Sequence, residues 1–250
     1  MRHSRVPQAR ERIRLYVEAP LAHGAAVDLS AVQARYLDAV RRLMVGESVL
    51  VFNGRDGEWR ASLATLGHGN GKLAVDEQTR GQSGATDLWL LQALIKRGPM
   101  ELVIEKAAEL GAACIQLVTT EYSQRRGANM RRLRTIAIAA AEQCGRLDIP
   151  VIAEAVSLPD ILADWPQGRR LIHCDESRAG PPMNEALAAA SAPAAILIGP
   201  EGGFSPDEQA ALAATTFATP VSLGPRILRA ETAALAALTL WQALAGDWRA

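Results

Sequence analysis

The chain has 250 residues, of which 49% are hydrophobic and 22% charged, and its formal net charge is zero. That length fits one large domain or two modest ones, and the composition is ordinary for a folded soluble protein. No apolar run approaches the ~20 residues of a membrane-spanning helix, and the arginine-rich N-terminus lacks the apolar core of a secretory signal. We therefore expect a cytoplasmic protein with no membrane partner.

The zero net charge hides an uneven distribution along the chain. Residues 1–81 carry 12 basic and 9 acidic side chains, a net charge of +3. Residues 82–250 carry 15 basic and 18 acidic side chains, a net charge of −3. Arginines cluster near the N-terminus and again over residues 125–134. Such clusters are typical of surfaces that neutralise nucleic-acid phosphates, and equally of a solvated protein face.

The first part of the sequence predicts a small β domain. Residues 1–11 are polar and arginine-rich, and we expect them to be flexible. One amphipathic helix is predicted over residues 30–43. Short strand patterns separated by glycine-rich turns predict a small β-barrel. The strands are expected at residues 13–17, 48–52, 58–66 and 72–75. A Gly/Ser-containing linker at residues 81–84 ends this domain, which we assign to residues 1–81.

Residues 82–250 alternate between strand and helix patterns. Helices are predicted over residues 99–110 and 129–144, among others. The expected strands are residues 88–95, 113–119, 151–156, 170–174, 194–198 and 218–223. This alternation predicts an α/β domain with a mostly parallel sheet covered by helices.

Two glycine-bearing loops follow the last two strand patterns. The first starts at Gly199-Pro200, and Ser205 to Glu208 then has the pattern of a capped helix start. The second starts at Gly224-Pro225 and precedes a long Ala/Leu-rich helix. Open α/β sheets bind ligands at the carboxyl ends of their strands, so the paired loops predict a ligand site. The first loop lacks the Lys-Ser/Thr of a phosphate-binding P-loop, and a structural turn is its alternative interpretation.

These two segments, LIGPEGGFSPDE and LGPRILRAETAAL, resemble the 16S rRNA (uracil-N3)-methyltransferase family of the SPOUT superfamily. Segments at residues 96–111 and 140–146 also match, and the resemblance covers nearly the whole chain. It implies a SPOUT α/β trefoil-knot methyltransferase domain at residues 82–250, preceded by a PUA-like RNA-binding β-barrel. It also implies S-adenosyl-L-methionine (SAM) as cofactor, 16S rRNA of the small ribosomal subunit as partner, a homodimer, and no metal.

The resemblance also implies roles for individual residues. Those placed around the cofactor are Leu171, His173, Leu197, Ile198, Gly199, Pro200, Glu201, Gly202, Gly203, Leu223, Gly224, Arg226, Ile227, Leu228, Glu231 and Thr232. Arg229 and Glu201 are the catalytic candidates: Arg229 to orient the uracil or stabilise its anion, and Glu201 to hold Arg229 or the cofactor. For each of the two, a charge at a helix terminus is the alternative.

Six arginines are candidates for RNA binding: Arg12, Arg14, Arg42, Arg125, Arg126 and Arg146. One position departs from the family pattern, because Tyr122 follows Thr120-Glu121 where the family commonly has an arginine. We expect Arg125 and Arg126 to compensate for that change.

The expected reaction is methylation of N3 of a specific uridine. N3 must lose its proton to a base or water, and a nearby cation lowers its pKa. Because N3 lies on the pairing edge, the target base must be unpaired or flipped out. Two alternatives stay open: a related SPOUT enzyme that methylates another base or a ribose 2′-hydroxyl, and a non-catalytic RNA-binding assembly factor.

Overall fold

Separate hydrophobic cores divide the chain into two units. The computed structural model describes residues 13–67, 69–84, 86–125, 127–175, 180–187 and 192–249. Unit 1 comprises Met1–Gly84 together with Ala141–Asp148, and unit 2 comprises Ala85–Ala140 and Ile149–Ala250. Residues 1–11, for which we predicted flexibility, lie outside the described ranges.

Unit 1 is built on one five-stranded sheet. Its strands are β1 (Arg14–Tyr16), β2 (Ala26–Leu29), β3 (Ser48–Phe52), β4 (Glu58–Gly67) and β5 (Asn70–Arg80). The order is β1-β3-β4-β5-β2, with β1 and β3 parallel and the other pairs antiparallel. Strands β1 and β2 are the edges, so the pairings of the described residues do not close this sheet into the expected barrel.

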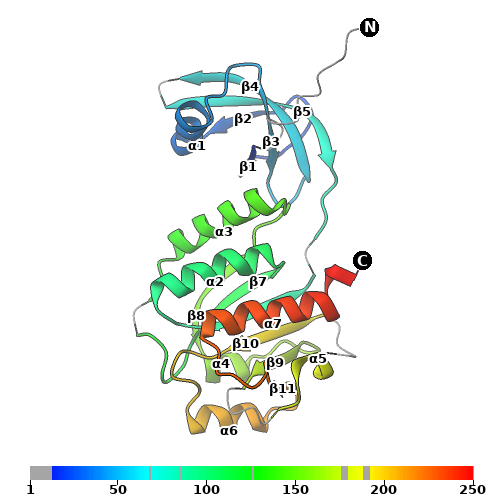
Figure 1. Ribbon diagram of the computed structural model, residues 1–250. Helices are drawn as coiled ribbons and strands as arrows, with labels where there is room; N and C mark the ends of the chain where they lie inside the picture. Colours follow the sequence, from blue (N-terminus) through cyan, green and yellow to red (C-terminus); the bar gives the residue numbers. More distant parts are fainter. Residues whose placement is uncertain are drawn as a thin grey trace. The chain divides into compact units, whose positions relative to one another are not determined.

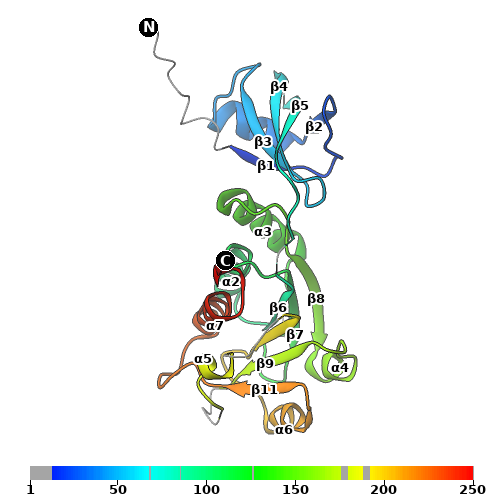
Figure 2. The same cartoon turned by 90° about the vertical axis from the view of Figure 1, so that its right-hand side faces the viewer.

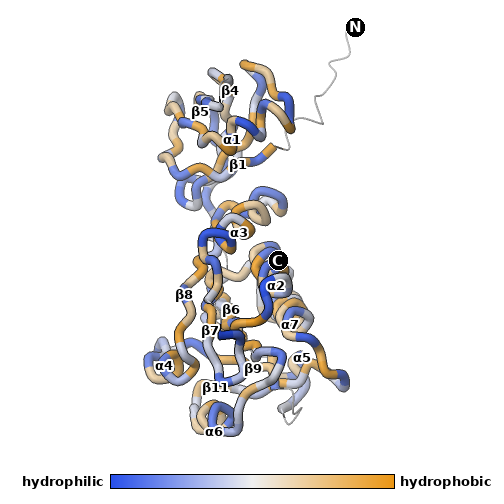
Figure 3. Tube along the Cα trace, turned by 90° about the vertical axis from the view of Figure 1, so that its left-hand side faces the viewer, coloured by the Kyte–Doolittle hydropathy of each residue, from blue (hydrophilic) through white to orange (hydrophobic). Residues whose placement is uncertain are grey.

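Alternating side chains give unit 1 its core. Leu73 and Val75 of β5 point inward between exposed or half-buried neighbours, and Figure 3 shows hydrophobic and hydrophilic residues alternating along these strands. Four of these strands were predicted from the sequence, and β2 was not. The predicted helix 30–43 is two short elements, α1 (Ala31–Arg35) and η1 (Tyr36–Val40, a π-helix), started by a Ser30–Gln33 capping box.

Unit 2 contains a six-stranded parallel sheet. Its strands are β6 (Leu88–Ala93), β7 (Cys114–Thr119), β8 (Val151–Ser157), β9 (Arg170–Cys174), β10 (Ala194–Ile198) and β11 (Ala218–Val221). All six predicted strands are confirmed, in the order β11-β9-β10-β6-β7-β8. Every residue of β10 is buried, since strands of a parallel sheet are covered on both faces.

Helices cover both faces of this sheet (Figures 1 and 2). One face carries α2 (Arg97–Glu109), α5 (Met183–Ala186), α7 (Ala230–Leu244) and the first part of α3 (Met130–Cys144). The other carries α4 (Leu158–Ala163) and α6 (Pro206–Ala214), and the short 3-10 helix η2 (Asp247–Arg249) follows α7. The chain progresses outward from β6 through β7 to β8 and then returns to the other side of β6. Such a reversal opens a crevice at the carboxyl ends of the strands.

None of the described helices combines the length and apolar character that crossing a bilayer requires.

Candidate functional site

The loop after β10 is a rigid turn. The backbone N–H of Gly203 donates to the carbonyl of Pro200 at 3.1 Å, and Gly203 has φ of 70°, a conformation that favours glycine. The predicted start of α6 is confirmed: Glu208 N–H donates to Ser205 Oγ at 3.3 Å, and Ser205 N–H to Glu208 Oε2 at 2.9 Å. A buried strand and a buried cap therefore fix residues 199–204 at both ends.

The loop after β11 is tied to the short helix α5. Ser222 N–H donates to Pro181 O at 2.9 Å, and Met183 N–H donates to Ser222 O at 3.0 Å. The loop then reaches Arg229, the N-cap of α7, whose side chain makes no capping bond. The second loop thus leads into a 15-residue helix, α7, whose first turn lies near the first loop.

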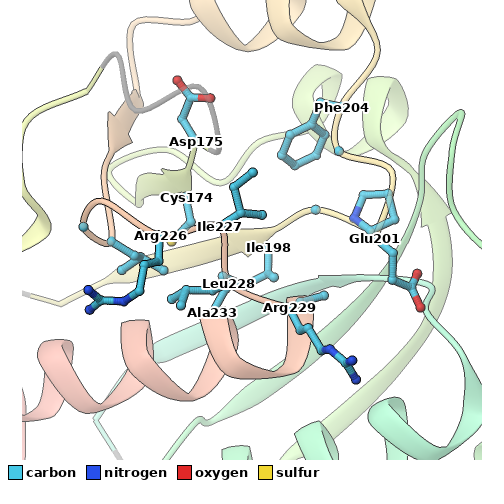
Figure 4. A pocket seen from close by; sticks show the side chains of 16 residues that line it. Cys174, Asp175, Ile198, Glu201, Phe204, Arg226, Ile227, Leu228, Arg229 and Ala233 are labelled. Atoms are coloured by element: carbon cyan, nitrogen blue, oxygen red, sulfur yellow. The ribbon is translucent and has the colours of Figure 1, made fainter.

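Both loops line one cavity of about 240 Å³, shown in Figure 4. The end of β9 contributes two residues and the first turn of α7 two more. The lining residues are Cys174, Asp175, Ile198, Gly199, Pro200, Glu201, Gly203, Phe204, Leu223, Gly224, Arg226, Ile227, Leu228, Arg229, Ala230 and Ala233. The lining is mostly small and apolar, with backbone groups of the two loops and a few charged side chains, as nucleoside sites require.

Eleven of the predicted site residues meet at this cavity. Ten are candidates for cofactor binding, of which Glu201 is also a catalytic candidate, and the eleventh is the catalytic candidate Arg229. They are Ile198, Gly199, Pro200, Glu201, Gly203, Leu223, Gly224, Arg226, Ile227, Leu228 and Arg229.

Six predicted residues do not line the cavity. Leu171 and Leu197 are fully buried in the core beneath α4 and α6, because alternate residues of a strand point to opposite faces. His173 is also buried, with its ring edge-on to Phe204 at a centroid distance of 6.3 Å. Gly202 faces another loop, described below. Glu231 and Thr232 are half-buried and exposed residues, respectively, of the first turn of α7.

Five residues that line the cavity were not predicted from the sequence: Cys174, Asp175, Phe204, Ala230 and Ala233. For Cys174 and Asp175 a signal was present, since they stand at the carboxyl end of a predicted strand. The alanines carry no chemical signal and line the cavity only because α7 begins there.

Burial sets the protonation state of two neighbouring groups at the end of β9, of which Cys174 lines the cavity and His173 does not. It raises the pKa of the Cys174 thiol to about 12, so this residue is an apolar thiol at neutral pH. It also lowers the pKa of His173, against a smaller opposing effect of the Asp175 carboxylate. The imidazole is therefore neutral at pH 7. Among the described residues no group of three or more His, Cys, Asp or Glu side chains could hold a metal ion.

The two catalytic candidates are exposed and are not joined to each other. Glu201 Oε1 accepts a long hydrogen bond, 3.4 Å, from the backbone N–H of Lys96. No ion pair between Glu201 and Arg229 occurs within the described part of the chain. In Figure 4 their side chains extend toward one side of the cavity and Arg226 toward the other. The expectation that Glu201 holds Arg229 is thus not supported by a contact, and the Arg229 guanidinium is free to meet a ligand.

The predicted RNA-binding arginines fall into two groups. Arg14 is a half-buried residue of unit 1 whose side chain pairs with Glu58 at 2.7 Å and lies 4.4 Å from the centroid of the Phe52 ring. Arg146, also half-buried, pairs with Asp148 at 2.7 Å. The guanidinium groups of Arg14 and Arg146 are thus engaged in internal contacts. Arg42 and Arg125 are exposed, whereas Arg12 and Arg126 lie outside the described residues.

Arg14 also binds the end of α3, within the same unit. It donates to the carbonyls of Ala141 at 2.7 Å and Arg146 at 2.8 Å. Burial raises the pKa of Glu58, but hydrogen bonds from Arg80 and Arg14 together outweigh it, so the pKa lies below its ordinary value. Glu58 is therefore a buried, ionised carboxylate that forms ion pairs with both Arg14 and Arg80.

The sequence matches a family model described as an RNA methyltransferase domain, over residues 82–242. The ribosomal RNA small subunit methyltransferase E of Rickettsia conorii is 32% identical over 226 residues, which is 90% of this chain and 93% of that protein. The protein of the same name from Synechocystis is 35% identical, over 88% of this chain and 74% of its own length.

Solved structures with bound SAM show the same architecture. The ribosomal RNA small subunit methyltransferase E of Neisseria gonorrhoeae, bound to S-adenosyl methionine, matches 94% of this chain and 99% of its own, with a TM-score of 0.85 and 29% identity. A methyltransferase of Legionella pneumophila in complex with SAM also has a TM-score of 0.85, with 32% identity over 94% of this chain and 98% of its own.

Proposed function

Since the chain belongs to the ribosomal RNA small subunit methyltransferase E family, we propose that it methylates N3 of one specific uridine in 16S rRNA with SAM as the methyl donor. The observation that carries this proposal is the cavity at which both predicted loops and the start of α7 meet. This cavity lies at the carboxyl ends of the parallel strands, where open α/β sheets bind ligands, and at the two loops for which the sequence predicts a ligand site.

The residues around the cavity fit the adenosine part of SAM. Ile198, Leu223 and Leu228 offer apolar surface for a flat ring, while the backbone of residues 199–203 offers donors and acceptors for its polar edge. The neutral Cys174 thiol adds soft apolar surface. When bound, SAM supplies an electrophilic methyl group on its sulfonium.

The residues of the chain then act on the uracil. Arg229 would place its guanidinium near the ring oxygens, which would lower the pKa of N3 and stabilise the anion left after a base or water takes the proton. With SAM bound, orientation of the uracil toward the methyl group by the residues around the cavity would supply much of the remaining acceleration. Glu201, hydrogen-bonded to the backbone of Lys96, borders the space between cofactor and RNA.

The proposal extends to the finer architecture. Residues 1–81 form a PUA-like RNA-binding domain, and residues 82–250 form the methyltransferase domain. Arg42 in the first domain and Arg125 in the second are exposed candidates for phosphate contact. Unit 2 forms the trefoil knot of SPOUT enzymes, which is supported by the placement of β10 between β9 and β6 and of α7 against α2. The protein acts as a cytoplasmic homodimer.

The test uses small ribosomal subunits from cells that lack this gene. They are incubated with the protein and methyl-labelled SAM, and the labelled nucleoside is identified by mass spectrometry. We expect 3-methyluridine in 16S rRNA. Label on a ribose, on another base or on tRNA would overturn the assigned target, and saturable SAM binding without any transfer would favour an assembly factor.

A further inference from the structure

Tyr122 lies in a tight turn that follows β7. Ser123 closes this turn: its backbone N–H donates to Thr120 O at 3.2 Å, and its Oγ accepts from Thr120 N–H at 3.0 Å. The same hydroxyl donates to Thr120 O at 2.9 Å. The backbone on either side of Tyr122 is therefore held by local bonds.

The turn is also anchored to two other elements of unit 2. The N–H of Glu121 donates to Glu208 Oε1 at 2.9 Å, while the other oxygen of this buried carboxylate caps α6. The N–H of Gln124 donates to Leu94 O, just after β6, at 2.9 Å. One carboxylate thus fixes both the Tyr122 turn and the end of the loop at residues 199–204.

Tyr122 lies directly against that loop. A Cβ atom built on Gly202 would come within 3.0 Å of Tyr122 Cβ and 3.8 Å of Cδ2, so a side chain at this position would push Tyr122 away by a few tenths of an ångström. Glu201 and Gly203, on either side of Gly202, both line the cavity. Tyr122 is nonetheless 48% exposed, and none of the ring pairs formed by the described residues includes it.

We propose that Tyr122 binds RNA by stacking an unpaired base beside the rim of the cavity. This inference rests on the proposed function, because flipping a target base leaves the adjoining bases without their stacking partners. An exposed aromatic ring on a backbone held by hydrogen bonds is the kind of platform on which single-stranded bases stack. The side chain of Arg125, three residues along, is exposed and suits a neighbouring phosphate.

The first test compares three variants for binding to small subunits and for methyl transfer. Tyr122→Leu keeps an apolar contact with Gly202 but removes the ring, and Tyr122→Phe keeps both. Trp248→Leu is the matched control, since Trp248 is another exposed aromatic residue of unit 2, 55% exposed, that does not line the cavity. SAM affinity, measured by calorimetry, reports whether the cavity is intact.

We expect Tyr122→Leu to weaken subunit binding and raise KM for subunits about 10-fold, the effect of one lost stacked base. SAM affinity and kcat should remain within about twofold of wild type, and so should all parameters of Tyr122→Phe and Trp248→Leu. Unchanged binding and KM in Tyr122→Leu would overturn the inference, and so would loss of SAM affinity in that variant, which would make the ring a support of the cavity.

Ultraviolet cross-linking tests the contact without relying on catalysis. Wild-type protein is irradiated with small subunits and digested with trypsin, and a nucleotide adduct is expected on peptide 107–125, which contains Tyr122. Adducts confined to other peptides would contradict the inference. An adduct at Tyr122 without methyl transfer would refute the proposed function alone, whereas transfer with normal KM in Tyr122→Leu would refute the stacking role alone.

Discussion

The two units use arginine and glutamate in opposite ways. In unit 1, the side chains of Arg14 and Glu58 are only 9% and 5% exposed, and every partner of the carboxylate is a cation or a hydroxyl. In unit 2, Arg229 and Glu201 are exposed at the mouth of a cavity, and no ion pair joins them. A buried, paired charge stabilises the fold, whereas an exposed charge beside a cavity can act on a ligand. The residue type alone does not tell a structural charge from one that acts on a ligand. The interaction partners of the side chain do.

The largest expected effect comes from breaking the buried pair. Glu58→Gln leaves the guanidinium of Arg14 without its anion, and we expect the free energy of unfolding to fall by ~3–5 kcal/mol. Urea unfolding at pH 7 measures it, with Glu77→Gln, an exposed carboxylate of the same sheet, as control. Equal stability of the two variants would show that the pair contributes nothing.

The same pair predicts a pH dependence. Because the folded-state pKa of Glu58 is below the ordinary value of 4.5, its stabilisation is complete above that pH and is lost as the pH falls through the folded pKa. Wild type should therefore lose more stability than Glu58→Gln between pH 5 and about pH 3. Parallel stability profiles for the two proteins would contradict this.

A smaller effect is expected at the first cavity loop. Gly203→Ala places a side chain at a φ of 70°, which costs ~1–2 kcal/mol. We expect a corresponding loss of stability or a roughly tenfold weaker SAM affinity by calorimetry, because the loop must hold its turn. Gly84→Ala is the control, since that residue has open space and no positive φ. Wild-type values in both assays for Gly203→Ala would show that the turn tolerates a side chain.

The smallest effect is expected at the exposed arginines. Arg125→Gln should raise KM for small subunits a few-fold. It should also reduce the slope of the logarithm of the binding constant against the logarithm of the salt concentration by about the contribution of one phosphate contact. Arg132→Gln is the control, because Arg132 is paired with Glu101. If the Arg132 variant binds subunits as weakly as the Arg125 variant, the paired and unpaired arginines are equivalent for RNA.

Most of unit 2 could be predicted from the sequence. Its parallel strands are buried on both faces, so β10 is a continuous apolar run, and Ser205-Pro206-Asp207-Glu208 marks the start of α6 by its capping chemistry. Unit 1 was harder, because the edges of its sheet depend on pairings between residues that lie far apart in the sequence, such as β1 with β3 and β2 with β5.

The site was predictable where glycines and loop signals mark it, and less so where side-chain direction decides. Leu197 and Ile198 are adjacent and equally apolar, yet only Ile198 lines the cavity. The burial of Arg14 was also invisible in the sequence, since its partners Ala141 and Arg146 lie more than 120 residues away.

The comparison between the units depends most on Arg229. The most direct measurement is the single-turnover rate of methyl transfer by Arg229→Met, with SAM affinity and unfolding free energy determined on the same protein. We predict a rate about 10²–10³-fold below wild type, the loss caused by removing one group that stabilises developing charge, with affinity and stability unchanged. A rate near wild type would contradict the account, and so would a loss explained entirely by weaker SAM binding or by unfolding.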